Sequence, residues 1–227
     1  MLVLAFDTSS PSGSVAIVRD GALVAELTVG NVGTHADWLM NAVTRLLGSA
    51  GIDIKEVDLF AVDNGPGSFT GLRIGVATVK GLAWALGKKV AGVSTLESLA
   101  LNLRYSGLVV CPLLDARKGE VYSALYRFNG AATSAVMEDS VMAPEALFRA
   151  ASEVGSPVVF LGGGLNVYGE AVRKNVKGAL VAPEALWHIR ASNVALLALQ
   201  NPSAASDPSE LLPAYLRKSE AELKAGK

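Results

Sequence analysis

Residues 58–86 read Asp58-Leu-Phe-Ala-Val-Asp-Asn-Gly-Pro-Gly-Ser-Phe-Thr-Gly-Leu-Arg-Ile-Gly-Val-Ala-Thr-Val-Lys-Gly-Leu-Ala-Trp-Ala-Leu86. The apolar run from Leu59 to Val62 ends in the turn cluster Asn64-Gly-Pro-Gly67, a pattern typical of a short buried strand followed by a turn. From Phe69 to Leu86 apolar residues recur at helical spacing. The stretch therefore predicts a buried strand, a glycine turn and a long helix.

The predicted helix has two apolar faces. One face carries the larger residues Leu72, Val76, Val79, Ala83 and Leu86, and the other carries Gly71, Gly75, Thr78, Gly81 and Ala85. An interior glycine costs a helix roughly 0.5–1 kcal/mol relative to alanine, so three of them need a compensating contact. We expect the larger face to lie on a sheet and the small face to pack closely against a second helix, from this chain or from another.

Composition limits the class of protein. The chain has 227 residues, 51% of them hydrophobic, and a net charge of −1, which predicts a soluble protein with a sizeable core and no broad basic surface for nucleic acid. A single cysteine, Cys111, allows no internal disulfide and fits a reducing compartment. The sequence shows no secretory signal and no apolar run long enough to span a membrane, so we expect a cytoplasmic protein.

Two halves of the chain show the same order of predicted elements. The first half predicts strands at 2–6, 14–18 and 22–29, a helix at 35–50 with Thr34 and Asp37 resembling a capping box, the central strand and helix, a strand at 89–93 and a helix from Ser94. The second half predicts strands at 108–114, 120–128 and 133–141, a helix from Pro144, a strand at 158–161, a helix at 166–174, a weak strand at 179–181, a helix at 192–199, and a closing segment at 211–222.

This repetition predicts two similar lobes. We expect residues 1–104 to form an N-terminal lobe and residues 105–227 a C-terminal lobe, whose final segment could pack back on the first lobe. Each lobe is a mixed sheet flanked by helices, and by analogy the fold class is the duplicated actin-like ATPase fold (ASKHA, ribonuclease H-like). Ligands of such sheets usually bind at the strand-to-helix turns on their carboxyl ends.

Several catalytic motifs fit poorly. The spacing Gly65-Pro-Gly67-Ser-Phe-Thr-Gly71 approaches a dinucleotide-binding fingerprint, but the strand ending at Val93 is followed by serine and threonine instead of an acidic residue for a ribose. A Walker phosphate loop needs Gly-Lys-Ser or Gly-Lys-Thr, and neither occurs in the sequence. A nucleophile elbow fails at Ser68, because proline stands two residues before it.

Metal and thiol chemistry are also disfavoured. The two histidines, His35 and His188, cannot form a His-x-x-x-His pair, and we predict no metal site and no catalytic residue. His35 is expected at the entry of a helix and His188 at a surface or packing position. Cys111 lies in an apolar strand before a proline, where an inert core thiol is the favoured interpretation.

Two loops are candidates for degenerate nucleotide binding. Asp7, Thr8 and Ser9 end the first strand, where an actin-like fold has its first phosphate loop, although kinases of that group tend to have glycine where Ser9 stands. A polar turn explains the same residues equally well. Gly162, Gly163 and Gly164 could contact an adenosine or form a strand-to-helix turn.

Four segments resemble one family. They are Leu4-Ala-Phe-Asp-Thr-Ser-Ser10, Asn64-Gly-Pro-Gly-Ser-Phe-Thr-Gly-Leu-Arg-Ile-Gly75 with Lys80-Gly-Leu-Ala83, Asp115-Ala-Arg-Lys-Gly-Glu-Val-Tyr122, and Pro213-Ala-Tyr-Leu-Arg217. Together they span nearly the whole chain, and they resemble the TsaB (YeaZ) family of tRNA threonylcarbamoyladenosine biosynthesis proteins. The resemblance implies the actin-like fold. It also implies a role in placing a threonylcarbamoyl group on N6 of an adenosine beside the tRNA anticodon.

The family resemblance implies an accessory role. In that family the transfer is catalysed by the paralogue TsaD, which holds a metal through a His-x-x-x-His motif, and the ATPase TsaE joins the complex. The resemblance therefore implies a non-enzymatic partner of TsaD and TsaE that reaches tRNA only through the complex, forms a homodimer in isolation and has no membrane contact. No cofactor is expected to be required, and any ATP binding is expected to be weak. The peptidase designation given to this superfamily is not expected to apply.

The family also implies where the partner binds. Its first two helices pair with those of TsaD or of a second copy, and on the central helix we expect this contact at Gly71, Arg73, Ile74, Gly75, Thr78 and Leu82. The alternative is that the small-residue face packs against the helix at 35–50 within the lobe. The alternative function is a stand-alone ATP-binding transferase or kinase of the same superfamily.

Overall fold

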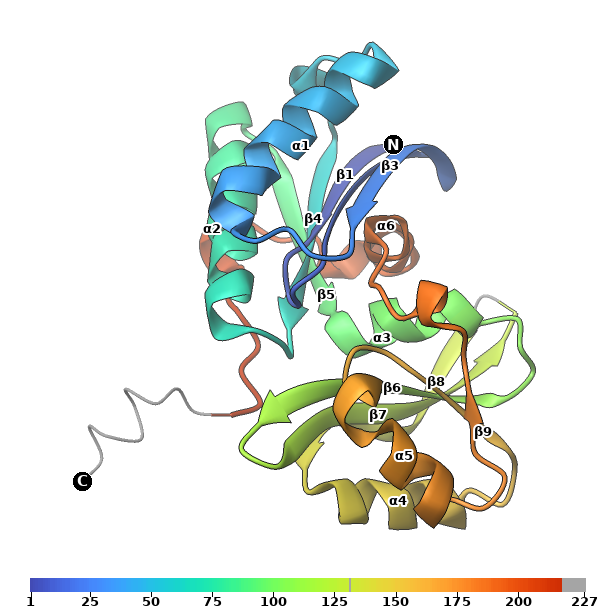
Figure 1. Ribbon diagram of the computed structural model, residues 1–227. Coiled ribbons are helices and arrows are strands. Elements are labelled where there is room, and N and C mark those ends of the chain that lie inside the picture. Colours follow the sequence, from blue (N-terminus) through green and yellow to red (C-terminus); the bar gives the residue numbers. More distant parts are fainter. Residues whose placement is uncertain (131, 218–227) are drawn as a thin grey trace. The chain divides into compact units, whose positions relative to one another are not determined.

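The computed structural model describes residues 1–130 and 132–217, and it divides into two compact units (Figure 1). The first unit contains residues 1–98 and 189–215, and the second contains residues 99–188 and the segment that begins at Leu216. The division expected after residue 104 differs from this one in two ways. The first unit ends six residues earlier, and it takes back the segment 189–215 from the second half of the chain.

The first unit is built on a five-stranded sheet with the order β3-β2-β1-β4-β5. Its strands are β1 (Leu2–Asp7), β2 (Gly13–Arg19), β3 (Ala22–Val29), β4 (Leu59–Gly65) and β5 (Lys89–Ser94). β1 pairs antiparallel with β2 and parallel with β4, with Phe6 opposite Val62. The sheet is mixed, as predicted, and β1 and β4 end side by side at its carboxyl edge.

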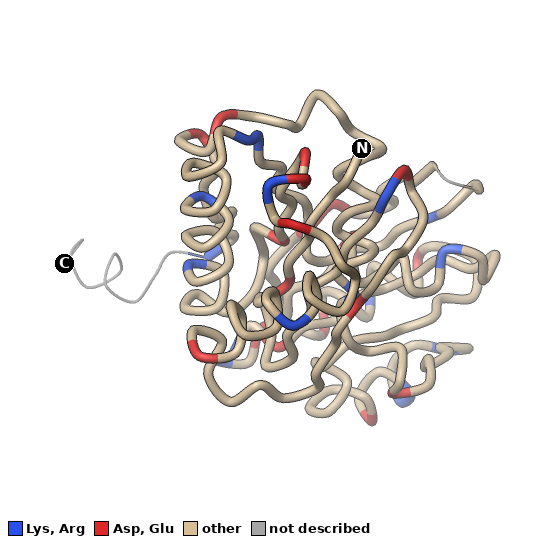
Figure 2. The backbone as a smooth tube through the Cα atoms, turned by 90° about the horizontal axis from the view of Figure 1, so that it is seen from above, with Lys and Arg blue, Asp and Glu red and all other residues tan. Residues whose placement is uncertain are grey.

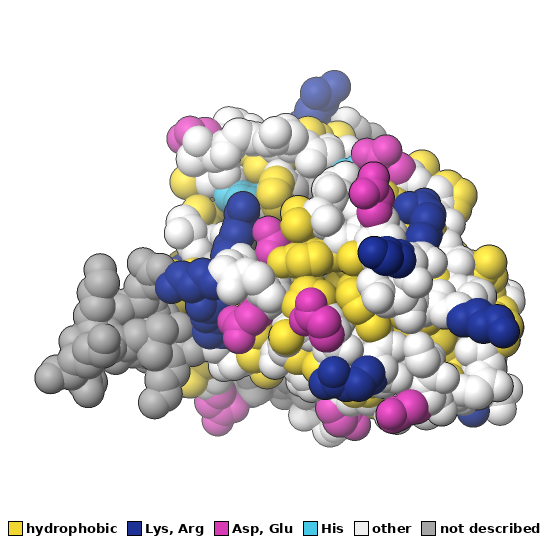
Figure 3. Space-filling model, turned by 60° about the horizontal axis from the view of Figure 1, so that its bottom comes forward, with side chains coloured by type: hydrophobic (Ala, Val, Ile, Leu, Met, Phe, Trp, Pro, Cys, Tyr) yellow, Lys and Arg dark blue, Asp and Glu magenta, His cyan; other side chains and the backbone are white. Residues whose placement is uncertain are grey.

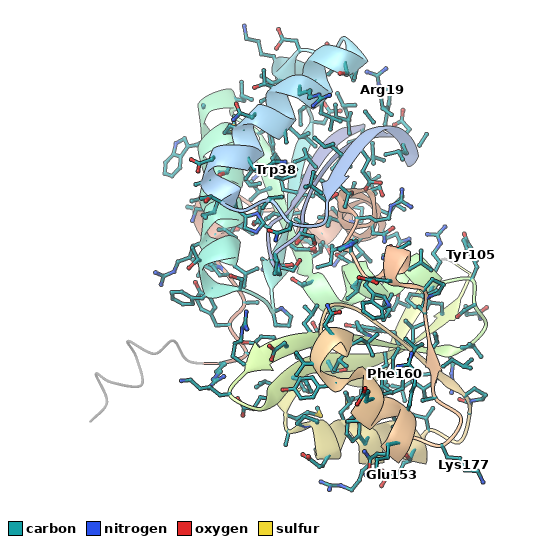
Figure 4. All side chains as sticks on the ribbon, viewed as in Figure 1. Arg19, Trp38, Tyr105, Glu153, Phe160 and Lys177 are labelled. Carbon is teal, nitrogen blue, oxygen red and sulfur yellow. The ribbon has the colours of Figure 1, made fainter. Side chains whose placement is uncertain are left out.

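Three helices cover this sheet. α1 (His35–Ala50) lies against β2 and β3, and α2 (Phe69–Leu86) lies against β4 and β5, so the two are neighbours on one face (Figure 1). α6 (Ala191–Gln200) covers the opposite face. The core between the sheet and α1 and α2 includes Phe6 and Phe60, and Trp38 of α1 packs against it (Figure 4).

The second unit repeats the same topology. Its sheet has the order β10-β9-β6-β7-β8, formed by β6 (Val109–Arg117), β7 (Glu120–Asn129), β8 (Ala132–Met142), β9 (Val158–Leu161) and β10 (Leu180–Val181). α4 (Pro144–Glu153) and α5 (Leu165–Asn175) pack on one face of it, over a core that contains Phe160 (Figure 4). The short helix α3 (Thr95–Ala100) precedes this sheet. The predicted duplication is therefore confirmed by the strand order of the two sheets.

Several helix ends agree with the sequence and one does not. α2 begins after Ser68, whose hydroxyl accepts a hydrogen bond from the Gly71 amide, and ends before Gly87 in the left-handed conformation. The capping box expected at Thr34 and Asp37 is absent, because the Thr34 side chain makes no capping hydrogen bond. The predicted closing segment 211–222 lies partly outside the described residues, and its described part is not helical.

Charges of both signs are dispersed over both units. Figure 2 shows acidic and basic positions interspersed along the chain, and Figure 3 shows both kinds among hydrophobic and uncharged groups on one face. Among the described residues, no helix combines the length and the apolar character needed to cross a bilayer.

Candidate functional site

The turn after β1 is fastened to the start of α2. The Thr8 hydroxyl donates to the Gly71 carbonyl at 2.8 Å, and the Ser68 amide donates to the Ser9 carbonyl at 2.7 Å. Thr8 and Ser9 are buried. The Asp7-Thr8-Ser9 candidate loop and the glycine turn at 65–71 thus form one packed junction.

This junction explains Gly71 and Gly75 of α2 and the preceding Gly67, but not Gly81. A Cβ at Gly71 would overlap the Thr8 carbonyl oxygen, a Cβ at Gly75 would overlap the Thr8 hydroxyl, and a Cβ at Gly67 would overlap the Ser9 carbonyl oxygen. Close approach of another backbone was the expected reason for these glycines. That backbone is the turn after β1, in place of a second helix.

The expected partner contact at Gly71 and Gly75 is therefore corrected. Both residues are buried against Thr8, so neither is available to another protein. Packing of these glycines against the helix at 35–50, the alternative, is not observed either, although α1 and α2 do touch. Helical spacing placed the small residues of α2 on one side correctly. It could not show which other segment covers each of them.

A buried carboxylate organises the same turn. The Asp7 carboxylate accepts hydrogen bonds from the Ser9 amide at 2.8 Å and the Ser9 hydroxyl at 2.6 Å. Burial raises the pKa of Asp7 to about 7, and the two bonds from Ser9 oppose this rise. Its other carboxylate oxygen has no hydrogen-bond partner among the described residues. The Ser9 amide, which a phosphate-binding loop would offer to a ligand, is used by the chain itself.

Asp63 lies beside Asp7 in the sheet. It follows Val62, which is opposite Phe6, and it accepts a hydrogen bond from the Ser98 hydroxyl at 2.6 Å. Both carboxyl groups are fully buried.

The glycine run of the second unit is mainly structural. A Cβ at Gly162 would lie 2.6 Å from the Leu113 carbonyl oxygen, and a Cβ at Gly164 would lie 2.8 Å from the same atom. The Gly164 amide also donates to this oxygen, at 2.9 Å. Gly163 alone faces open space, with nothing within 4 Å of its Cβ position. The strand-to-helix interpretation accounts for Gly162 and Gly164, and Gly163 is left with no structural requirement.

The exposed side of α2, together with Met40 of α1, is largely apolar, whereas the other exposed residues of α1 include the charged Asp37 and Arg45. We call this apolar area the α1–α2 surface and define it by Met40, Ala77, Gly81, Trp84 and Ala85, all of which are exposed. The Trp84 side chain has an exposed fraction of 70%. Outside its own turn of helix, no atom of the described residues lies within 4 Å of the position that a Cβ would take at Gly81, so a second helix can approach closely there.

The remaining expected contact residues border this surface. Arg73 is exposed, whereas Ile74, Thr78 and Leu82 are half-buried. Sequence reasoning missed Met40, Ala77 and Trp84. Trp84 could have been found from the sequence, because it lies away from the aliphatic face of the helix. A large aromatic side chain exposed to solvent often marks a contact with another molecule.

The C-terminal part of the first unit forms a strap over α2, comprising residues 206–215. The Lys80 ammonium donates to the carbonyls of Ser209 at 3.3 Å and Leu211 at 3.0 Å. Tyr215 stacks on Phe69 with ring centroids 4.8 Å apart, and its hydroxyl accepts a hydrogen bond from Arg73 at 3.0 Å. Arg73 is therefore oriented by the strap at the edge of the α1–α2 surface.

His35 and Cys111, which were considered for metal or thiol chemistry, have surroundings that give them structural roles. His35 lies at the first position of α1, and its Nε2 is 2.7 Å from the Ser10 carbonyl oxygen. Cys111 is buried, and burial raises its pKa to about 12, so the thiol stays protonated at neutral pH as predicted. The part of the chain that the structure describes contains no group of three or more potential metal-ligating side chains.

Comparison with known proteins gives a clear family. The family model described as TsaD, tRNA N6-adenosine threonylcarbamoyltransferase, matches residues 32–225. The tRNA threonylcarbamoyladenosine biosynthesis protein TsaB of Bacillus subtilis is 35% identical over 227 residues, covering 99% of this chain and 97% of that protein. The chain belongs to the TsaB (YeaZ) family.

Solved structures agree with this assignment. YeaZ from Pseudomonas aeruginosa superposes with a TM-score of 0.80 at 29% identity, covering 95% of this chain and 99% of that one. Component A of (R)-2-hydroxyglutaryl-CoA dehydratase from Acidaminococcus fermentans has a TM-score of 0.52 at 13% identity, covering 89% and 99% of the two chains. This second likeness concerns the fold alone. The TsaB-family chain thus has the predicted actin-like ATPase fold.

Proposed function

We propose that this chain acts in tRNA threonylcarbamoyladenosine biosynthesis as a non-catalytic partner and activator of TsaD. In this proposal TsaD transfers the threonylcarbamoyl group from threonylcarbamoyl-adenylate to N6 of the adenosine beside the anticodon, and TsaE completes the complex. The observation that carries the proposal is the 35% identity to a TsaB protein along the whole chain. The match of the transferase's own family model to residues 32–225 supports a paralogous relation to TsaD.

The α1–α2 surface is the proposed contact with TsaD. It offers an exposed tryptophan beside small residues, and aromatic anchors with close backbone approach favour tight helix pairing. Arg73, Ile74, Thr78 and Leu82 form its border. In the absence of TsaD, the same surface is proposed to pair with a second copy of the chain. The complex is proposed to act in the cytoplasm, with tRNA bound through the assembly.

No cofactor is proposed for this chain. The turn after β1 is closed by its own contacts. The Asp7 carboxylate accepts a hydrogen bond from the Ser9 amide, and the Thr8 hydroxyl donates one to the Gly71 carbonyl of α2. This closure disfavours phosphate binding at the turn and leaves at most weak ATP affinity.

The alternative is a stand-alone ATP-binding transferase or kinase. The actin-like fold and the open position at Gly163 favour it. Calorimetric titration of the isolated chain with ATP and Mg²⁺ separates the two functions, because an independent enzyme must bind the nucleotide tightly and an activator need not. Micromolar or tighter binding would favour the alternative.

The direct test is a reconstituted transfer assay. Unmodified tRNA, threonylcarbamoyl-adenylate, TsaD and TsaE are incubated with and without this chain, and the modified nucleoside is measured. We expect transfer only when the chain is present and none from the chain alone. Equal transfer in its absence rejects the activator role.

A further inference from the structure

Two aromatic side chains hold Arg73 in one orientation. Its guanidinium carbon lies 3.9 Å from the centre of the Phe69 ring, and its Nε donates a hydrogen bond to the Tyr215 hydroxyl at 3.0 Å. Phe69 and Tyr215 stack on each other, with ring centroids 4.8 Å apart. The cation therefore lies on an aromatic platform, although the residue is exposed.

The strap that carries Tyr215 is itself attached to the sheet. The Ala214 amide donates to the Asn64 carbonyl at 2.7 Å, and the Asn64 side-chain amide donates to the Leu212 carbonyl at 3.1 Å. These bonds fix the position of Tyr215 and, through it, the direction of the Arg73 guanidinium. A side chain that is ordered before binding loses less conformational entropy when it meets a ligand.

The outer end of this guanidinium is available to a ligand. Within the described residues Arg73 forms no ion pair with a carboxylate, and its hydrogen bond to Tyr215 uses Nε alone. The two terminal nitrogens of a guanidinium are spaced to donate two parallel hydrogen bonds to the oxygens of one carboxylate. The geometry thus leaves Arg73 open to an acidic group that approaches end-on.

Arg73 continues the α1–α2 surface along α2. It lies one helical turn before Ala77 and two turns before Gly81, and all three residues are exposed. A protein that packs on this surface therefore reaches Arg73 as well. The exposed Trp84 farther along the same helix supplies the apolar area that a protein interface needs.

A second copy of the chain is a poor source of the acidic group. α2 contains the basic residues Arg73 and Lys80 and no acidic residue. α1 adds one acidic and one basic residue, Asp37 and Arg45. A symmetric pair of α2 helices would remove water from the guanidinium beside apolar or basic groups, which weakens association.

We propose that Arg73 binds a carboxylate of the partner protein and thereby favours this partner over a second copy of the chain. The inference rests on the proposed function, in which the partner on the α1–α2 surface is TsaD. Specificity is a difference between two affinities, and an oriented charge that only one partner can satisfy produces such a difference. Arg73 is thus a residue that determines partner choice.

The test compares two associations in the same set of variants. Arg73→Met removes the charge and keeps an apolar side chain over Phe69, and Arg73→Lys keeps the charge without the planar donors. Arg149→Met, at an exposed position of α4 in the second unit, removes the same charge elsewhere and is the control. Binding to TsaD is measured by calorimetry and self-association by sedimentation equilibrium. Melting temperatures verify that each variant is folded.

Arg73→Met should bind TsaD at least tenfold more weakly and should self-associate no less tightly than wild type. Arg73→Lys should recover only part of the affinity for TsaD, because an ammonium group cannot form two parallel hydrogen bonds to a carboxylate. The control should change neither association. Unchanged affinity of folded Arg73→Met for TsaD overturns the proposal. Equal weakening of both associations also overturns it, because Arg73 would then stabilise the surface without selecting a partner.

Acidic residues of this chain are a second possible source of the carboxylate. Glu220 and Glu222 lie outside the described residues, and the variant Glu220→Gln, Glu222→Gln should leave both associations unchanged. Tighter binding of TsaD by this variant assigns the guanidinium to these residues and overturns the proposal. If wild type does not bind TsaD, the proposed function is rejected, whereas the self-association of Arg73→Met still shows whether Arg73 disfavours a second copy.

Discussion

Asp7 is the residue on which the first unit's carboxyl edge depends. Its carboxylate closes the turn after β1 by accepting two hydrogen bonds from Ser9, while burial raises its pKa to about 7. In the unfolded chain the same group titrates near its ordinary value of 3.8. The folded state therefore holds a proton that the unfolded state releases at lower pH, and folding is coupled to pH through this residue.

Wild-type stability should fall as pH rises from about 4 to about 7, by up to about 1.4 kcal/mol per pH unit, and should level off above that range. The Asp7→Asn variant keeps an acceptor for Ser9 but cannot ionise. Urea unfolding at pH 5 and pH 8 should show a smaller pH dependence for this variant than for wild type. Asp37→Asn, an exposed substitution in α1, is the control. Equal pH dependence in all three proteins would contradict this assignment.

Two glycines of α2 should respond oppositely to the same change. Gly75→Ala places a methyl group against the Thr8 hydroxyl and Val62, and should destabilise the unit by about 1–3 kcal/mol. Gly81→Ala meets nothing within 4 Å and should stabilise it by about 0.5–1 kcal/mol, because alanine is the better helix former. Urea midpoints measure both effects. Similar midpoints for the two variants would show that Gly75 is not constrained by the turn.

At the scale of elements, α2 has a different neighbour on each side. Its aliphatic side packs on the sheet, Gly71 and Gly75 meet the turn after β1, the strap covers Phe69, and the remaining side is exposed. The range Phe69–Leu86 was predicted because apolar periodicity and the flanking glycines define it locally. The contact of the aliphatic side with the sheet was also predicted and is confirmed, but the contacts with the turn after β1 and with the strap were not predicted, because those segments are distant in sequence.

Opening of the strap can be measured by hydrogen exchange. Tyr215→Ala removes the stack on Phe69 and the acceptor for Arg73, so the strap should open more often. The Ala214 amide, which donates to the Asn64 carbonyl at 2.7 Å, should then exchange with deuterium about tenfold faster. Amides in β1 serve as the internal reference and should not change. Equal protection of Ala214 in both proteins would show that the aromatic stack does not hold the strap.

At the scale of the whole molecule, the duplication was predicted, and the final segment was expected to pack back on the first lobe, but the return of α6 to the first unit was not expected. Three strands followed by alternating helices and strands define each sheet, and both sheets have the predicted arrangement. The assignment of residues 189–210 to the first unit was not predicted, because α6 has an ordinary apolar helix pattern that fits either lobe. The polar turn at Asp7 and the glycines of α2 were each identified from the sequence. The contact between them was not predicted, because no local sequence pattern encodes a contact between distant segments.

We propose that this chain activates TsaD through the exposed side of α2. The most direct test is the reconstituted transfer assay with Gly81→Arg, which adds a long charged side chain where nothing lies within 4 Å, so the monomer should stay folded. Val167→Arg, on an exposed position of α5 in the second unit, adds the same charge elsewhere. We predict that Gly81→Arg reduces transfer at least tenfold and that Val167→Arg does not. Full activity of folded Gly81→Arg would show that the exposed side of α2 is not needed to activate TsaD.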